Sequence, residues 1–311
     1  MKKNISLIIC AVLIFLSVVV GFIDNEQVVV GAGNGKNAKI TTSNQVIDLL
    51  SFISDNDYSS NTAHNSSSGL SLSLLSQNTG EEKEEYTSVT FGNSSNTYMS
   101  YETGYSNVRY SLERQLTVYM TKTNAYYESK GFLRQTITSE NDTQRISYRF
   151  DANAYFDAEH VLFRFNELQV SGVSFAETEL IVGKWIDFSS EGDGLLDVNM
   201  ANYEILRRIK DYIDEKLDTN FTKKGNVYKL NDGMGDALSI FGINVDVDDE
   251  EYINFDFVIN LSQKTRPTMD LILKSQPITS MENLVFYNIN NTVVRPIDTD
   301  NVIKADELMG N

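Results

Sequence analysis

The sequence predicts an α+β fold in which a large, curved antiparallel β-sheet, a half-barrel, carries two amphipathic helices on one face. Two observations predict this fold. Apolar and polar residues alternate along much of the chain after residue 70, and two segments, 43–56 and 199–218, instead have apolar residues at helical spacing. A third observation, an uncharged apolar run at residues 5–23, adds an N-terminal transmembrane helix or signal peptide.

The apolar run at 5–23 is long enough to cross a membrane, because a spanning helix needs about 20 apolar residues at a rise of about 1.5 Å each. Lys2 and Lys3 precede the run, and positively charged flanks stay on the cytoplasmic side. We therefore expect a single-pass anchor in the cell membrane with the C-terminal domain outside the cytoplasm.

Two other interpretations of this run are open. A signal peptidase could cut after Gly21, since Val19 and Gly21 are small enough for the −3 and −1 positions, and the domain would then be secreted. Cys10 could be the acylated residue of a lipoprotein. However, Ile9 is bulky where a small residue belongs, and most of the apolar run follows the cysteine.

The composition limits the partners and the compartment. The chain of 311 residues has 26 Lys and Arg against 43 Asp and Glu, so its net charge is −17. Such a surface repels duplex nucleic acid and anionic lipid, and we expect neither as a partner. The only cysteine, Cys10, lies in the apolar run, so the exported domain has no thiol for a disulfide or a thiolate metal site. This pattern favours a bacterial cell envelope over a secreted eukaryotic domain.

Residues 24–41 predict a flexible linker before a β-rich domain at 42–298, and 299–311 predict a polar tail. The linker contains GAGNGK at 31–36, which resembles two phosphate-binding motifs. The dinucleotide motif needs a glycine where Lys36 stands, and the P-loop needs Gly and Ser or Thr where Val30 and Asn37 stand. We therefore expect no nucleotide here, and the sequence indicates no other cofactor.

Alternation over five or more residues predicts strands with one buried and one solvated side, which build antiparallel sheets. The clearest case is 253–261, where apolar residues occupy every second position. Similar patterns predict strands at 70–74, 116–121, 145–150, 161–165 and 243–247. Short polar stretches predict turns at 129–131, 139–143 and 248–251.

Two helices interrupt this pattern. The longer, at 199–218, has an apolar stripe on one face and charged residues on the other, and Asp197 or Asn199 could cap it. The shorter, at 43–56, could be capped by Ser43 or Asn44. Its apolar stripe consists of Val46, Leu49, Leu50 and Ile53.

Three stretches resemble strands of a known group of proteins: NAYYE at 124–128 with GKWIDF at 183–188, KGNVYKL at 224–230, and FYN at 286–288 with VRPID at 294–298. In these stretches and in the order of its elements, the chain resembles the LolA and LppX/LprG-like superfamily of bacterial envelope lipoprotein carriers. The resemblance implies a half-barrel plugged by helices and an apolar cavity that holds acyl chains or lipoprotein lipid. No polar site residue carries over from it, and the chain lacks a lipobox.

The common catalytic and metal-binding patterns are missing from the sequence, and we expect no enzyme. His64 and His160 have no suitably spaced partner for a metal site or a catalytic triad. The acidic run at 246–251 lacks the spacing of a calcium loop and predicts a solvated turn. The loop at 191–194 predicts a capping turn. Carboxylate pairs for glycoside hydrolysis would assemble only in three dimensions, and a single tryptophan argues against a sugar-binding platform.

The space between the sheet and the long helix is the candidate ligand cavity. Its predicted wall residues are Trp185, Ile205, Leu206, Ile209 and Ile213, which would otherwise fill an ordinary core. We predict a non-enzymatic, membrane-tethered extracytoplasmic binding module for a lipid-like or apolar ligand, because burial of apolar surface supplies affinity without a polar motif. The alternatives are an envelope sensor or protein-interaction domain with a filled core, and a structural surface protein.

Overall fold

The computed structural model describes residues 45–55, 86–103, 105–157, 159–172, 181–189, 194–240, 253–275, 278–294, 296–297, 302–305 and 307. The apolar run, the linker, His64 and the acidic run at 246–251 lie outside these residues, as do the predicted strands at 70–74 and 243–247. Within the described part of the chain, no helix is long and apolar enough to span a membrane.

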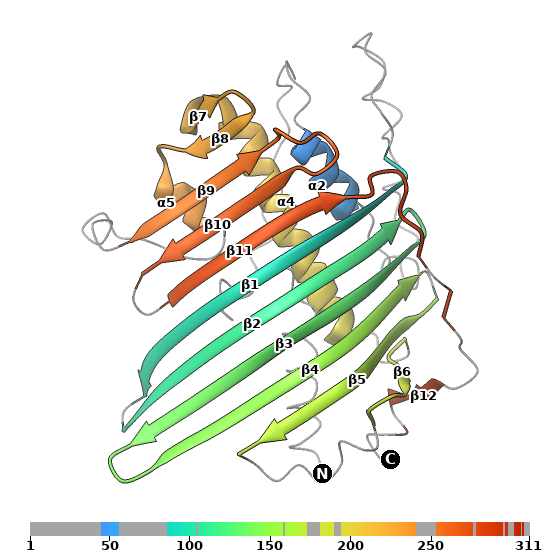
Figure 1. Ribbon diagram of the computed structural model, residues 1–311, viewed down its shortest axis with the longest axis vertical. Helices are drawn as coiled ribbons and strands as arrows, with labels where there is room; N and C mark the ends of the chain where they lie inside the picture. The colour runs from blue at the N-terminus through green and yellow to red at the C-terminus, as the bar shows by residue number, and fades with distance from the viewer. Residues whose placement is uncertain are drawn as a thin grey trace.

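Five consecutive antiparallel strands, four of them 15 or 16 residues long, form the first half of the sheet (Figure 1). They are β1 (Ser88–Thr103), β2 (Ser106–Thr121), β3 (Asn124–Ser139), β4 (Thr143–Asp157) and β5 (Val161–Ser171). The predicted turn at 139–143 is confirmed: it joins β3 to β4, and the N–H of Ser139 donates to the carbonyl of Asp142 at 2.9 Å. The predicted turn at 129–131 is wrong, because these residues lie within β3.

Gly131 shows why a glycine stands inside this strand. A Cβ at this position would lie 2.5 Å from the carbonyl oxygen of Glu113 on β2 and 2.6 Å from the ring of Phe150 on β4. The glycine therefore permits a close approach of the neighbouring strands, and its presence in the sequence is not a turn signal here.

We expect Gly131→Ala to lower the free energy of unfolding by about 1–3 kcal/mol, because the backbone oxygen of Glu113 cannot move aside without shifting β2. The matched control is Gly92→Ala on β1, where the nearest atom to a new Cβ lies at 3.7 Å and no loss is expected. Urea unfolding of both variants checks the prediction. Equal stabilities for the two would contradict it.

The second half of the sheet is also a meander, and it joins the first half through β11 and β1. Its strands are β7 (Phe221–Lys224), β8 (Val227–Leu230), β9 (Asn254–Asn260), β10 (Thr268–Lys274) and β11 (Ile278–Tyr287). The predicted strand at 253–261 is confirmed as β9. Helix α4 (Gly194–Asn220) crosses the strands and ends at the β7 edge of the sheet (Figure 1).

The remaining edge of the sheet departs from the antiparallel pattern. Strand β6 (Trp185–Asp187) pairs antiparallel with β5, but β12 (Val302–Lys304) pairs with β6 in parallel. Residues 302–304 were predicted to belong to a polar tail beyond the domain, and in the structure they complete a sheet of twelve described strands. A strand of three residues is too short to show alternation in the sequence. It can be recognised only from its pairing with β6 in the structure.

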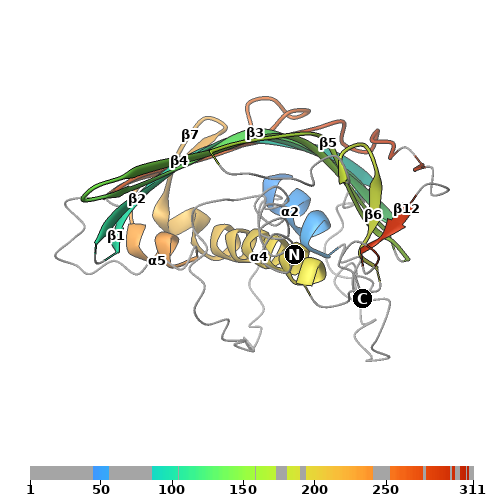
Figure 2. The same cartoon turned by 90° about the horizontal axis from the view of Figure 1, so that it is seen from below.

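The sheet curves into an arch, and the helices lie on its concave side (Figure 2). The two predicted helices are confirmed as α2 (Gln45–Asp55) and α4, and a third, α5 (Met234–Ser239), joins them. Helix α4 begins at Gly194. Asp197 and Asn199 therefore lie inside the helix, and neither is its cap, because a capping residue has a non-helical backbone.

The main hydrophobic core lies between the concave face and the helices. Alternate residues of the long strands supply one wall, and the apolar stripes of α2 and α4 supply the other. Its largest fully buried side chains on the sheet are Phe91, Phe156, Phe163, Phe165, Phe257 and Phe286. The observed architecture is thus an α+β fold with a curved, mainly antiparallel sheet and helices on its concave side.

Candidate functional site

The predicted wall residues fall into two separate places. Leu206, Ile209 and Ile213 on α4 are at most 1% exposed and belong to the main core, with Ile205 packed against it. A side chain without exposed surface adjoins no space large enough for a water molecule. The described face of α4 is therefore closely packed against its neighbours.

Trp185 does not meet these helix residues. Its neighbour Ile186 belongs to the main core, so Trp185 projects from the convex face of β6. There it packs in a small cluster with Tyr155 and Leu162, and the guanidinium of Arg164 lies 4.9 Å from the centre of its ring. Parts of the C-terminal segment cover this cluster through Val294, Ile297 and Val302.

The concave face instead contains a group of buried polar side chains at its centre. Three adjacent strands supply them: Arg114 on β2 lies opposite Ser95 on β1, and Ser95 lies opposite Glu282 on β11. None is more than 7% exposed. We call this group the inner polar cluster, and its members are Asn93, Ser95, Thr97, Arg114, Ser280 and Glu282.

The carboxylate of Glu282 is the centre of the cluster's hydrogen bonds. Its Oε1 accepts from Ser95 Oγ at 2.6 Å and from Ser280 Oγ at 3.2 Å, and its Oε2 accepts from Asn93 Nδ2 at 3.0 Å. A further bond of 2.8 Å joins Thr97 Oγ1 to Ser280 Oγ. The carboxylate is thus oriented by donors from two strands and held in one position.

Burial and charge oppose each other in the cluster. Burial raises the pKa of Glu282, while Arg114 and the three hydrogen bonds act to lower it. Burial lowers the pKa of Arg114 to about 10, and Glu282 opposes this change. Arg114 therefore keeps its charge at neutral pH inside the protein, where an ion is stable only with compensating groups nearby.

One polar atom beside the cluster makes no hydrogen bond within the described structure. Ser129 on β3 lies opposite Leu116, one strand beyond β2 on the same face, and is 2% exposed. Its Oγ has no partner. Because an unsatisfied buried polar group costs about 1–3 kcal/mol, this hydroxyl is available to a bound group.

The sequence carried a signal for this cluster that pattern analysis missed. Arg114 stands in phase with Leu112 and Leu116, and Glu282 stands in phase with Leu284 and Phe286. A charged residue in the apolar phase of a strand is either paired or functional. Only the register shows that β1 lies between their two strands and brings both to the same part of the face.

His160 has a structural role at the turn between β4 and β5. Asp157 Oδ1 accepts the backbone N–H groups of Glu159 and His160 and lies 3.0 Å from His160 Nδ1. Burial raises the pKa of Asp157, but these bonds, with one from Tyr155, outweigh burial and lower it. Among the described residues, no three His, Cys, Asp or Glu gather as a metal site.

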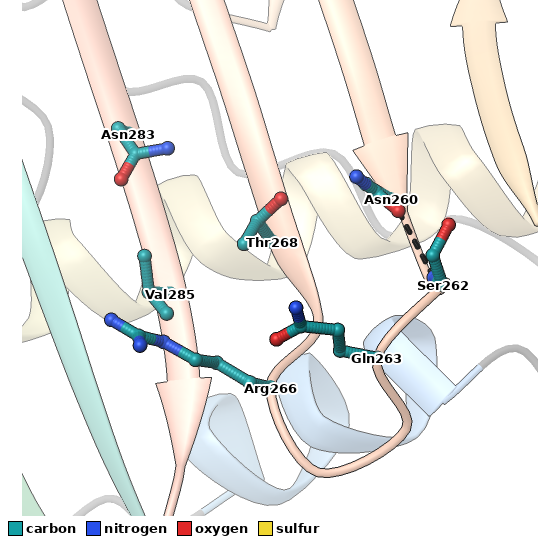
Figure 3. Close-up of a pocket in the computed structure, with 7 residues that line it drawn as sticks. All are labelled: Asn260, Ser262, Gln263, Arg266, Thr268, Asn283 and Val285. Atoms are coloured by element: carbon teal, nitrogen blue, oxygen red, sulfur yellow. Dashed lines mark hydrogen bonds between the residues drawn. The ribbon is translucent and has the colours of Figure 1, made fainter.

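An open pocket of about 330 Å³, lined mainly by polar residues, lies on the convex face, on the side of β9–β11 away from the helices (Figure 3). It contains none of the predicted wall residues. Asn260 and Asn283 line it on β9 and β11, with Arg266 on the loop before β10. Its one internal bond in Figure 3 is the 3.0 Å bond from the N–H of Ser262 to Asn260 Oδ1.

Comparison with known proteins does not assign a family. Searches of protein-family models and of curated proteins find no match to this chain. Membership of the LolA and LppX/LprG-like superfamily therefore stays a prediction, and the function is argued from the described residues.

Proposed function

We propose that this chain is a non-enzymatic binding module, tethered to the membrane outside the cytoplasm, that holds an amphiphilic, lipid-like ligand on the concave face of its sheet. The inner polar cluster carries this proposal. It places a buried arginine and a buried glutamate among apolar rows, and the unpartnered hydroxyl of Ser129 lies beside it. This arrangement suits a ligand with one polar group and an apolar body.

The apolar part of such a ligand would lie along the inner rows of the strands. Leu112 and Leu116 flank Arg114 on β2, and Leu284 and Phe286 continue the row of Glu282 on β11. Burial of apolar area contributes about 25 cal/mol per Å², so an acyl chain supplies affinity and the polar cluster supplies orientation. Because the described face of α4 is closely packed, the ligand enters only if a covering segment moves.

The test is native mass spectrometry of the full chain purified from membranes in a mild detergent. We expect a bound mass that is released on denaturation, and a several-fold lower occupancy in Ser95→Ala, which loses the 2.6 Å bond to Glu282. The matched control is Ser94→Ala, one residue away on the exposed convex face, which should keep full occupancy. Folded wild-type protein without any bound mass would refute the proposal.

One observation favours a second candidate, an envelope interaction domain with a filled core. Leu206, Ile209 and Ile213 have the exposure of ordinary core residues. In that case the polar cluster specifies strand register, as buried polar groups do in some proteins. The same experiment separates the two, because a filled-core domain retains no ligand and its Ser95→Ala variant changes stability alone.

A further inference from the structure

Four arginines lie together on the convex face of β2, β3 and β4, although the chain as a whole is strongly acidic. The register places Arg109 opposite Thr136, which lies opposite Arg145, so these two arginines share a row. Arg134 stands two residues from Thr136 on β3, and Arg149 stands four residues from Arg145 on β4. We call Arg109, Arg134, Arg145 and Arg149 the arginine patch.

The patch is a strip of modest size. Neighbouring strands lie about 4.8 Å apart and each residue rises about 3.3 Å along a strand. The Cα atoms of Arg109 and Arg145 are therefore about 10 Å apart, and those of Arg145 and Arg149 about 13 Å apart. Ser111 and Ser147 flank Arg134 in its own row, and their small hydroxyls leave the guanidinium groups accessible. The strip therefore presents several guanidinium groups side by side on the convex face of the sheet.

The charges of the patch are available to a partner. All four side chains are exposed, and in the described structure none of them forms an ion pair. Lys130 on the same face differs, since its Nζ lies 2.9 Å from Asp151. The patch's own contacts are weak: Arg134 lies over the ring of Phe132 at 5.2 Å, and Arg109 Nε donates to Asn107 at 3.1 Å.

Acidic residues border the strip and restrict what it can bind. They are Glu102 and Glu113 on the neighbouring parts of β1 and β2, Glu140 and Asp142 in the β3–β4 turn, and Asp151 and Glu167 on the far side of Arg149. A broad anionic surface such as a membrane would meet these carboxylates as well as the arginines, within the Debye length of about 8 Å. A narrow chain can follow the arginines alone.

A protein partner fits the patch less well. Stable protein interfaces bury about 800 Å² on each side around an apolar centre. On the described parts of β3 and β4 no large apolar side chain is exposed, and Tyr98 is the one exposed aromatic residue diagonal to Arg109. The surface is rich in guanidinium groups and poor in apolar area, which suits an ionic ligand.

We propose that the arginine patch binds a linear polyanion with phosphate groups repeated along its length. The planar guanidinium donates two parallel hydrogen bonds to phosphate oxygens, and successive phosphates of one chain can reach arginines in different rows. The bound polyanion would cross β2, β3 and β4 on the convex face of the sheet. This surface is independent of the concave site of the proposed function.

The test measures binding of fluorescently labelled linear polyphosphate to the full chain in neutral detergent, by anisotropy. We expect Arg145→Gln/Arg149→Gln to weaken binding about ten-fold, since two charge-assisted contacts are lost. The matched control is Lys224→Gln/Lys264→Gln, which removes the same charge from two exposed lysines elsewhere and should bind like the wild type. Raising salt from 50 to 200 mM should weaken wild-type binding strongly.

Three results would overturn the proposal. The first is a failure of the wild type to bind polyphosphate at all. Equal weakening in both double variants counts as the same kind of failure, because it would show that binding depends on the overall charge and not on the patch. The second is stronger competition by phosphatidylglycerol vesicles or by polyglutamate than by unlabelled polyphosphate, which would indicate a membrane or an acidic protein. The third is a change of oligomeric state in Arg145→Gln/Arg149→Gln without polymer, which would assign the patch to contact with a second copy. None of these outcomes depends on ligand binding at the concave face.

Discussion

Replacement of Arg114 by methionine is expected to lower the free energy of unfolding by about 3–5 kcal/mol at pH 7, because it removes a charge that stabilises the buried carboxylate of Glu282. Glu282 would keep its bonds from Ser95, Asn93 and Ser280, but three neutral donors do not replace a guanidinium in a site that excludes water. Urea unfolding at fixed pH measures the loss.

The same variant should show a characteristic pH dependence. Burial already raises the pKa of Glu282 above its ordinary value of 4.5, and Arg114 opposes that rise. Without Arg114, the folded protein binds a proton at a higher pH than the unfolded chain does, so stability falls as pH rises through this window. The deficit of Arg114→Met should therefore shrink toward low pH.

Two further variants complete this test. Arg114→Met/Glu282→Gln removes both charges while the amide can still accept the bond from Ser95, and it should recover more than half of the lost stability at pH 7. Arg149→Met, an exposed arginine on the convex face, should change stability by no more than about 0.5 kcal/mol. A deficit that is independent of pH and is not recovered by the double variant would contradict a buried charge at Glu282.

Phe257→Ala on β9 is expected to lower the free energy of unfolding by about 3–5 kcal/mol, because the side chain is fully buried and its removal leaves a cavity. Phe257 packs edge-on against Phe221 on β7 at 5.3 Å between ring centres, and Phe221 packs against Tyr212 on α4 at 6.2 Å. This series of rings attaches the C-terminal half of α4 to the sheet.

Hydrogen exchange should locate the effect of Phe257→Ala. We expect faster exchange in α4 around Tyr212 and in β7, with β3 and β4 unchanged. Phe257→Leu retains most of the apolar volume and should lose less than half as much stability, and Phe132→Ala on the convex face should lose at most about 1 kcal/mol. Uniform acceleration across the sheet would show that the rings do not form a local attachment.

The predictions that succeeded rested on local periodicity. Alternation at 253–261 predicts β9, and helical spacing at 199–218 predicts α4. In each case the residues that face the core recur at a regular spacing within one short segment, so the segment by itself shows the pattern. The failures lie where distant segments meet. Gly131 resembled a turn residue because the close approach of Glu113 and Phe150 is a contact between strands, which the local sequence does not contain.

By itself, the sequence determined that the chain is rich in strands and has two main helices, where the amphipathic faces of α2 and α4 lie, and that the one cysteine lies in the apolar run at 5–23. Only the tertiary structure decided which strands are neighbours. The pairing of strands places Trp185 on the convex face. It also brings Ser95 next to Glu282, which is 187 positions away in the sequence. It also gathered four arginines on one surface. The physical reason is that periodicity reports which side of an element is buried, whereas pairing and register depend on contacts between segments that are remote in sequence.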